Sequence, residues 1–380
     1  MPLPRPLGLL LVIASFAALA AAPAAAASVP TRQATPAALT CEPLNPPAAP
    51  AATPAPDTEP AATPVPFEGE PVEVTVGYIP VSIYAPVFVA EAKGYFAEQG
   101  LDVSLENVAG GSEVVALTAS GQFDLAATGA GPGFWNAMAQ GLPLAVVAPG
   151  HAEGSPVATP LMISKEACES GAIGSVADLR GKRVSVNARG ATEYWLGQAL
   201  ATGGLTIDDV ELQTLAFPDA VVALESGALD AAMIGEPLAT RAERDGIAVR
   251  LAADFPVQDV QPTVILANTD FAGDNPAAVE GFVTAYLRAA RDLTGPGFKD
   301  PANLAIVEEY TGVPAALIAD AVQPLYFPNG EIDAAGFNKL QTFFRERGQL
   351  EYDEDIDPAT FVETRYVEAA LAALGPYQGG

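Results

Sequence analysis

Alternating apolar and polar positions mark the first predicted strand. Val72, Val74 and Val76 are separated by polar residues, and the run ends at Gly77. A period of two is typical of a β-strand with one buried face. Residues 85–99 carry a helical pattern that Gly100 closes, since glycine readily takes the left-handed conformation at a helix C-terminus. Further strands are predicted at 101–105, 123–127, 144–148 and 183–187. Alternating strands and helices predict an α/β fold with parallel sheets covered on both faces.

An internal repeat divides this pattern into two similar halves. Gly100-Leu101 is followed by VVAL at 114–117 and by SGQFDLAA at 120–127. Gly204-Leu205 is followed in the same order by VVAL at 221–224 and SGALDAA at 226–232. Two copies are too few for a solenoid, so we predict two similar α/β lobes; a chance likeness between ordinary α/β units is the alternative. Ligands of open parallel sheets bind beyond the carboxyl ends of the strands, so the loops there form the candidate site.

The first 70 residues predict export rather than a folded domain. Arg5 precedes an apolar run at 7–22 and small residues follow at 24–28, as in a secretory signal peptide spanning residues 1–27. An uncleaved anchor helix is the alternative. Residues 28–70 form a linker rich in Pro, Ala and Thr, a composition that favours an extended spacer over a packed core. We therefore expect an exported protein, periplasmic or associated with the cell surface.

Composition excludes several classes of function. The 46 acidic residues outnumber the 18 basic ones, and the net charge of −28 argues against nucleic-acid binding. One His and two distant Cys are too few for a zinc module or an iron–sulfur cluster, so we expect no metal and no cofactor. A single His also leaves little material for a nucleophile–base pair, so we predict no catalytic residues.

The two cysteines are Cys41, in the linker, and Cys168, in the folded part. An oxidising compartment permits a disulfide between them, and two free thiols are the alternative. A lipid on Cys41 is a weaker alternative, because Cys41 lies far beyond the apolar run and the preceding Ala38-Leu39-Thr40 is a poor lipidation signal.

Several motifs together resemble one family. Residues 76–105, with Lys93-Gly94-Tyr95-Phe96 and Gln99-Gly100-Leu101-Asp102-Val103, resemble the opening of ABC-transporter solute-binding proteins. The resemblance is to the nitrate/sulfonate/taurine and thiamine-pyrimidine-precursor type (SsuA/Thi5-like). Gly110-Gly111-Ser112, Phe123-Asp124-Leu125 and the run VADLRGKRV at 176–184 extend it. The likeness covers roughly residues 72–270 and is not specific for any one ligand.

The resemblance implies a two-lobe periplasmic-binding-protein fold of class II, a venus flytrap with hinge strands between the lobes. Residues 71–161 and 264–380 would form lobe 1 and residues 162–263 lobe 2, with crossings near 161–164 and 263–267. A ligand that touches both lobes would favour the closed state, which would dock on an ABC permease in the membrane. We expect a monomer with a small-molecule ligand.

Candidate ligand residues in the first half lie in the loops after the predicted strands. Free backbone N–H groups and hydroxyls there suit the polar edge of a ligand, and an aromatic ring suits a flat one. Each candidate also has a structural alternative, such as a helix cap for Ser112, a core position for Tyr84 or Trp135, and a surface position for His151. These candidates are Ser82, Tyr84, Gly111, Ser112, Thr128, Gly129, Trp135 and His151.

The sharpest candidates in the second half follow the strand at 183–187. Thr192 is expected to cap the next helix, and Tyr194 and Trp195 cannot both point the same way, so one is expected to line the ligand. Arg189 suits an anionic group, with a solvated surface charge as the alternative. Asp219 is expected to cap a helix from residue 220. The candidates in this half are Asn187, Arg189, Thr192, Tyr194, Trp195, Phe217 and Glu236.

The predicted ligand is a flat nitrogen heterocycle, and a small anion is the alternative. Glu193 and Glu236, with several aromatic residues, favour a flat nitrogen heterocycle such as a pyrimidine or a flavin-type vitamin precursor, because buried carboxylates repel an anion. Arg189 instead favours a small anion such as an alkanesulfonate, taurine or nitrate. A secreted ligand sensor would show the same features. The resemblance also extends to a fungal enzyme that makes the thiamine pyrimidine, but this chain lacks its cysteine-rich motif, so we expect a binding protein.

Overall fold

The computed structural model describes residues 41–42, 69–108 and 110–379. The predicted signal peptide at 1–27 and most of the linker at 28–70 lie outside the described residues. Within the described part, no helix is both long and apolar enough to cross a membrane.

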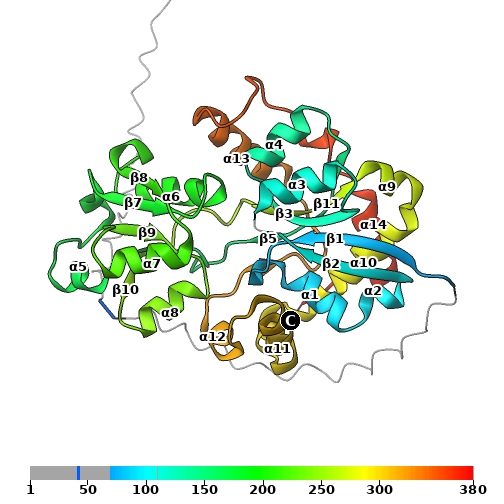
Figure 1. The fold of residues 1–380 in the computed structure, drawn as a ribbon, viewed down its shortest axis with the longest axis horizontal. Coiled ribbons are helices and arrows are strands. Elements are labelled where there is room, and N and C mark those ends of the chain that lie inside the picture. Colours follow the sequence, from blue (N-terminus) through cyan, green and yellow to red (C-terminus); the bar gives the residue numbers. More distant parts are fainter. Residues whose placement is uncertain (1–40, 43–68, 109, 380) are drawn as a thin grey trace, which may run out of the picture. The chain divides into compact units, whose positions relative to one another are not determined.

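The first sheet has five strands in the order β2-β1-β3-β11-β4 (Figure 1). The strand β1 runs parallel to β2 and β3, whereas β11 is antiparallel to both β3 and β4. Their bounds are β1 (Val72–Tyr78), β2 (Leu101–Asn107), β3 (Leu125–Gly129), β4 (Leu144–Pro149) and β11 (Thr263–Asn268).

The second sheet repeats this topology. Read in the matching direction, its order is β8-β7-β9-β6-β10, with β7 parallel to β8 and β9, and β6 antiparallel to β9 and β10. Its strands are β6 (Leu161–Ser164), β7 (Arg183–Val186), β8 (Glu211–Thr214), β9 (Ala231–Met233) and β10 (Ala248–Ala252). The two-lobe α/β fold is thus built from one strand order used twice. We call each sheet with its covering helices the first and the second lobe.

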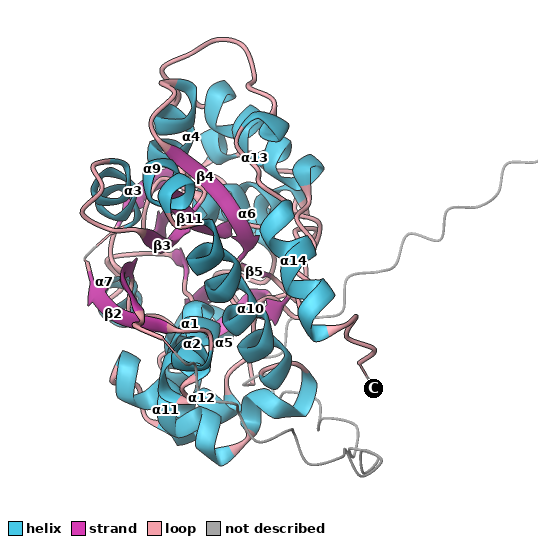
Figure 2. Ribbon diagram, turned by 90° about the vertical axis from the view of Figure 1, so that its right-hand side faces the viewer, coloured by secondary structure: helices cyan, strands magenta, loops and turns pink. Residues whose placement is uncertain are grey.

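A third, two-stranded sheet pairs β5 (His151–Ala152) with β12 (Leu325–Tyr326). Helices α10 and α14 lie side by side on the first lobe (Figure 2). The helices are α1 (Ala85–Ala92), α2 (Tyr95–Glu98), α3 (Gly111–Ala119), α4 (Pro132–Ala139), α5 (Lys165–Glu169), α6 (Ala191–Ala201), α7 (Phe217–Glu225), α8 (Leu238–Arg244), α9 (Thr269–Asp274), α10 (Pro276–Asp292), α11 (Pro301–Thr311), α12 (Ala315–Asp320), α13 (Ala334–Glu346) and α14 (Arg365–Leu374).

Successive side chains of a strand point to opposite faces of the first sheet, so they belong to two different hydrophobic cores. In β3, Leu125 and Ala127 belong to the core beneath α1 and α10, whereas Ala126 belongs to the core that α3 and α4 cover. That second core continues into one face of the second sheet and takes in Phe337 and Phe344 of α13. The helix α13 therefore packs with both lobes, and the exact lobe boundaries stay a prediction.

The repeated Asp has the same role in both lobes. The Oδ2 atom of Asp124 accepts a hydrogen bond from the backbone N–H of Thr75 in β1 at 2.8 Å. The Oδ2 atom of Asp230 accepts from the backbone N–H of Arg183 in β7 at 2.9 Å. Gly121 and Gly227, three residues earlier, both have a φ above +70° and reverse the chain after a helix. The internal repeat therefore corresponds to one structural unit used twice.

Four local predictions were wrong. The helix expected at 85–99 is divided into α1 and α2, because Gly94 takes a φ of +73° between them. Ser112, Thr192 and Asp219 do not cap their helices. These helices begin two or three residues earlier, after N-cap residues Gly110, Gly190 and Ala216.

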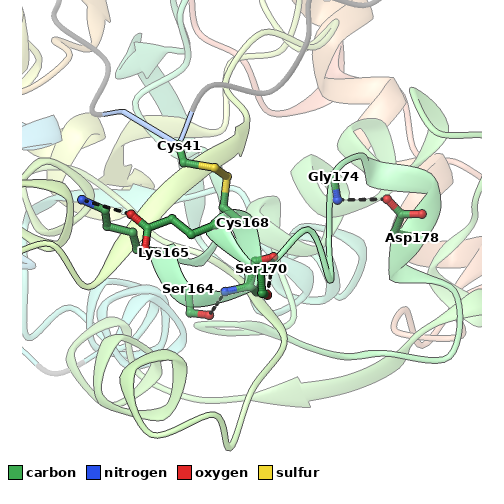
Figure 3. Close-up of a disulfide and its surroundings, with 9 residues drawn as sticks. Cys41, Ser164, Lys165, Cys168, Ser170, Gly174 and Asp178 are labelled. Atoms are coloured by element: carbon green, nitrogen blue, oxygen red, sulfur yellow. Dashed lines mark hydrogen bonds and ion pairs between the residues drawn. A yellow bond between two sulfur atoms is a disulfide. The ribbon is translucent and has the colours of Figure 1, made fainter.

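A disulfide joins Cys41 to Cys168 of α5 (Figure 3). Ser164 is the N-cap of this helix, and its hydroxyl accepts from the Ala167 N–H. The Cys168 side chain is buried. Since α5 follows β6 in the second sheet, the bond fixes a residue of the predicted linker to the second lobe.

Candidate functional site

The candidate site consists of the loops at the carboxyl ends of the parallel strands. In the first lobe, β1, β2 and β3 lead into the short 3-10 turn at Ser82–Tyr84, into α3 and into α4. In the second lobe, β7, β8 and β9 lead into α6, α7 and α8. We call these two groups of loops the first and the second carboxyl edge. Open α/β sheets bind their ligands at such edges.

Four of the five helices at these edges begin without a side-chain cap. Among the described residues, no side chain bonds to the first-turn N–H groups of α3, α4, α6 or α7. In α8, however, the Glu236 Oε2 accepts from the Thr240 N–H at 3.0 Å. By contrast, α5 and α9 follow the antiparallel strands β6 and β11 and start at the opposite edges. Ser164 and Asn268 cap them through their side chains. Uncapped N–H groups at a helix start favour an anion or a polar oxygen.

Four predicted residues of the first lobe lie together. Thr128 is buried, and its hydroxyl donates to the Gly111 carbonyl at 3.4 Å. A Cβ atom on Gly111 would lie 3.3 Å from the Thr128 Oγ1 and 4.0 Å from the Gly129 nitrogen. Ser112 is exposed on the first turn of α3, close to Gly133 of α4. A small residue at position 111 therefore allows the start of α3 to lie close to the end of β3.

Two predicted aromatic residues of the first lobe pack in its cores. Trp135 is fully buried, donates from Nε1 to the Ala130 carbonyl at 3.1 Å, and meets Phe134, Phe337 and Phe361 edge to face. Tyr84 is also buried, and burial raises the pKa of its hydroxyl. Both rings therefore have the core positions that were their structural alternatives.

His151 is buried in β5. The structural alternative, a position on the surface, was therefore wrong. The imidazole Nδ1 lies 2.7 Å from the Thr263 Oγ1, which also accepts from the His151 backbone N–H at 2.8 Å. Burial lowers the pKa of its imidazole to about 3, so the ring is neutral at physiological pH. Its place is beside the crossing between the lobes.

Arg189 and its neighbours form an exposed loop at the second carboxyl edge. The Thr192 hydroxyl donates to the Asn187 Oδ1 at 2.5 Å and to the Ala188 carbonyl at 3.2 Å, which ties the loop to the first turn of α6. The Arg189 side chain is exposed and has no bonded partner among the described residues. It is thus available to an anionic group.

Tyr194 and Trp195 are both largely buried, so neither ring is free at the edge. The Trp195 Nε1 donates to the Glu153 Oε1 at 3.1 Å. The Tyr194 ring packs edge to face on Phe343 of α13 and lines a groove of about 420 Å³ between α6 and α13. The prediction that one of them lines the ligand has no support from their placement.

The two carboxylates that favoured a heterocycle have protein partners. Glu193 is fully buried, and its oxygens accept from the Arg347 Nε at 3.1 Å and the Gln349 Nε2 at 2.7 Å. The buried Glu236 carboxylate accepts from the Arg250 Nη2 at 2.6 Å and the Thr240 Oγ1 at 2.9 Å. Neither carboxylate is therefore left to repel an anionic ligand or to bind a heterocycle N–H.

Phe217 is the one predicted aromatic residue that stays partly exposed. It opens α7, and a Cβ atom on Gly235 would lie 2.7 Å from its ring. Glycine at this position therefore allows the ring to lie against the β9–α8 loop. Ser82, at the first edge, is half-buried.

Sequence reasoning missed Glu153, Arg250 and Tyr326. Glu153 is buried and accepts from the Ala158 N–H at 2.5 Å and the Thr159 hydroxyl at 2.8 Å. Burial raises the pKa of this carboxyl, although the bonds from Thr159, Ala158 and Trp195 oppose the shift. The bond that Glu153 accepts from the Trp195 Nε1 comes from 42 residues away, and no local pattern predicts such a contact. Within the described part, no cluster of His, Cys, Asp and Glu is suited to a metal ion.

The fold is that of the periplasmic solute-binding components of ABC importers. The aliphatic sulphonate binding protein SsuA of Escherichia coli superposes with a TM-score of 0.64 at 22% identity, covering 77% of this chain and 92% of that one. The riboflavin-binding protein RibY of Chloroflexus aurantiacus is 29% identical over 83% of this chain and 90% of its own length. The taurine-binding periplasmic protein of Escherichia coli is 27% identical over 80% and 95%. The model of the NMT1/THI5 like family matches residues 82–296, and the chain belongs to this family.

Proposed function

We propose that this exported protein captures one small nutrient between its two lobes, delivers it to an ABC permease in the membrane and performs no catalysis. The single observation that carries the proposal is the duplicated carboxyl edge, at which the four helices α3, α4, α6 and α7 begin without a side-chain cap. A ligand held by both edges stabilises only the arrangement in which they are close together. Membership of a family that includes binding proteins supports this function.

The ligand carries an anionic group such as a sulfonate or carboxylate. Arg189 offers a charge at the second edge, and the starts of α3, α4 and α6 offer N–H groups after the glycine residues Gly110, Gly131 and Gly190. Repulsion by Glu193 and Glu236 was the argument against an anionic ligand. This argument no longer holds, because Arg347 pairs with Glu193 and Arg250 pairs with Glu236. The taurine-binding relative supports this ligand class.

A flat nitrogen heterocycle of the flavin or pyrimidine type is the second candidate. The riboflavin-binding relative favours it. The partly exposed ring of Phe217 at the second edge provides a stacking surface for it.

A thermal-shift panel tests both the function and the ligand class. Taurine, alkanesulfonates, nitrate, short carboxylates, pyrimidines and riboflavin are added separately to the purified protein. A ligand at about 100 times its Kd adds about 2.7 kcal/mol to the free energy of unfolding, which raises Tm by several degrees. Stabilisation by sulfonates or carboxylates alone supports the first candidate, and stabilisation by riboflavin or pyrimidines alone replaces it with the second. A protein that no compound stabilises, or that turns one over, contradicts the proposed function.

A further inference from the structure

A third segment accompanies the two chain crossings between the lobes. The crossings are residues 150–160 and 253–262, and they bond to each other through the Val157 N–H and the Ala253 carbonyl at 2.8 Å. The third segment is residues 321–326, which follow α12 and end in β12. This strand is antiparallel to β5, with Tyr326 opposite His151. Residues 321–326 do not cross between the lobes, yet they contact both.

One end of the segment bonds to the second carboxyl edge. The Val322 N–H donates to the Oε1 atom of Glu236 at 3.2 Å, directly after β9. Arg250 and Thr240 hold this carboxylate in place, and the Glu236 side chain is only 4% exposed. An ion pair between Arg244 of α8 and Asp320 of α12 lies two residues before Val322.

The other end bonds to the first carboxyl edge. The Tyr326 hydroxyl donates to the Ser82 carbonyl at 2.8 Å, in the turn that follows β1. The same carbonyl closes that turn by accepting from the Ala85 N–H. The Tyr326 ring is buried and stacks on Phe298 with centroids 6.3 Å apart, which fixes the direction of its hydroxyl.

We propose that residues 322–326 couple the two carboxyl edges, with Tyr326 as the positioning residue for the Ser82 turn and Glu236 as the anchor for the segment. The bonding positions are four residues apart, a span of at most about 13 Å even in an extended strand. The pairing of β12 with β5 stiffens this short connection. The coupling rests on the proposed function, because Ser82 and Glu236 matter to a ligand only if the edges bind one.

The test compares Tyr326→Phe with Tyr286→Phe in the full, ligand-free protein. Both variants remove one buried hydroxyl that donates to a backbone carbonyl, but Tyr286 of α10 donates to the carbonyls of Pro149 at 2.9 Å and Gly150 at 3.4 Å, neither of which belongs to the Ser82 turn. Hydrogen exchange is followed at residues 81–85 and 236–240. Coupling predicts that Tyr326→Phe accelerates exchange about threefold or more at both places, including the distant second edge. Tyr286→Phe should leave residues 236–240 at the wild-type rate.

If Tyr326 has only a structural role, Tyr326→Phe will accelerate hydrogen exchange near residues 81–85 alone, or lower protection uniformly over the protein. Either result overturns the coupling. An equal effect of both variants on residues 236–240 also overturns it. Taurine and riboflavin binding is measured on the same variants. Coupling predicts a Kd raised about three- to tenfold by Tyr326→Phe for whichever compound binds the wild type. If neither compound binds the wild type, the exchange result still decides the coupling, while the panel above decides the function.

Discussion

Arg189 differs from most basic side chains that the structure describes, since those form ion pairs with carboxylates. Replacing it by Gln should weaken an anionic ligand about tenfold or more, because a charged hydrogen bond contributes about 1.5–3 kcal/mol. Binding of a sulfonate or carboxylate by calorimetry measures the loss. Lys299→Gln is the matched control, since Lys299 is also exposed and forms no ion pair with a described residue, but lies after α10, in a separate 3-10 turn. Equal affinity in the Arg189 variant and the wild type would remove Arg189 from the site.

His151 makes the stability of the protein depend on pH. The unfolded imidazole takes up a proton near pH 6.5, whereas burial keeps the folded one neutral down to a pKa of about 3. The unfolded state therefore binds more protons between these values, and the free energy of unfolding falls by about 1.4 kcal/mol per pH unit as pH drops below 6.5.

Urea unfolding of wild type and His151→Gln at pH 7.5 and pH 5 measures this effect. The wild type should lose about 2 kcal/mol more than the variant over this interval. The raised pKa of Glu153 acts in the opposite direction but is common to both proteins, so it cancels in the comparison. The same pH dependence in both proteins would show that His151 is not the responsible group.

Sequence reasoning located the site loops better than the roles of their side chains. The pattern of strands and glycine residues predicted the loops that hold Gly111, Thr128 and Arg189, because strand ends are local signals. The partners of Trp195 and Glu236, by contrast, are Glu153 and Arg250, which lie 42 and 14 residues away in sequence. Such pairings depend on tertiary packing, so candidates chosen for their chemistry alone included core aromatic residues and carboxylates bonded within the protein.

At the level of elements, the repeated Asp gives a stability prediction. Asp124→Ala and Asp230→Ala each leave a strand N–H without its acceptor and should each cost about 1–3 kcal/mol. Asp219→Ala is the control, since this exposed residue caps no helix and should change stability by less than about 0.5 kcal/mol. Denaturant unfolding of the three variants measures the costs. A loss at Asp219 as large as at the other two would mean that the repeated bond has no special role.

The disulfide gives a second prediction at this level. It closes a loop of 127 residues, and the variant Cys41→Ser/Cys168→Ser should be about 2–5 kcal/mol less stable than the oxidised wild type. A reductant should lower the Tm of the wild type toward that of the variant and leave the variant unchanged. A wild type whose Tm does not respond to reductant would contradict a stabilising bond.

The order of elements was largely predictable, whereas their ends were not. The repeat and the alternation of Val72, Val74 and Val76 predicted the strands and the two lobes, because apolar periodicity is set by which face is buried. The early starts of α3, α6 and α7 were missed. The sequence suggested Ser112, Thr192 and Asp219 as caps. The helices α3 and α6 instead start after a glycine and α7 starts after an alanine, and none of these N-cap residues carries a capping side chain.

At the level of the whole molecule, both edges lie in a strongly negative protein, with 46 acidic and 18 basic residues. The field of the whole protein acts at long range and repels an anionic ligand, whereas Arg189 and the helix starts act at contact. Salt shortens the Debye length from about 30 Å at 0.01 M to about 10 Å at 0.1 M and so screens the long-range repulsion most. The association rate of an anionic ligand should therefore rise a few-fold over this range of salt.

Stopped-flow measurement of tryptophan fluorescence follows this rate for an alkanesulfonate or a short carboxylate without an amino group, with uncharged riboflavin as the reference. Riboflavin association should stay nearly constant, because it experiences no net force from the protein charge. If the association rate of the anion instead falls as salt is added, positive groups near Arg189 attract the anion at long range. The repulsion by the acidic surface would then not dominate. In that case the edges would attract the ligand as well as bind it, and Arg189→Gln would remove the salt dependence of the association rate as well as weaken binding.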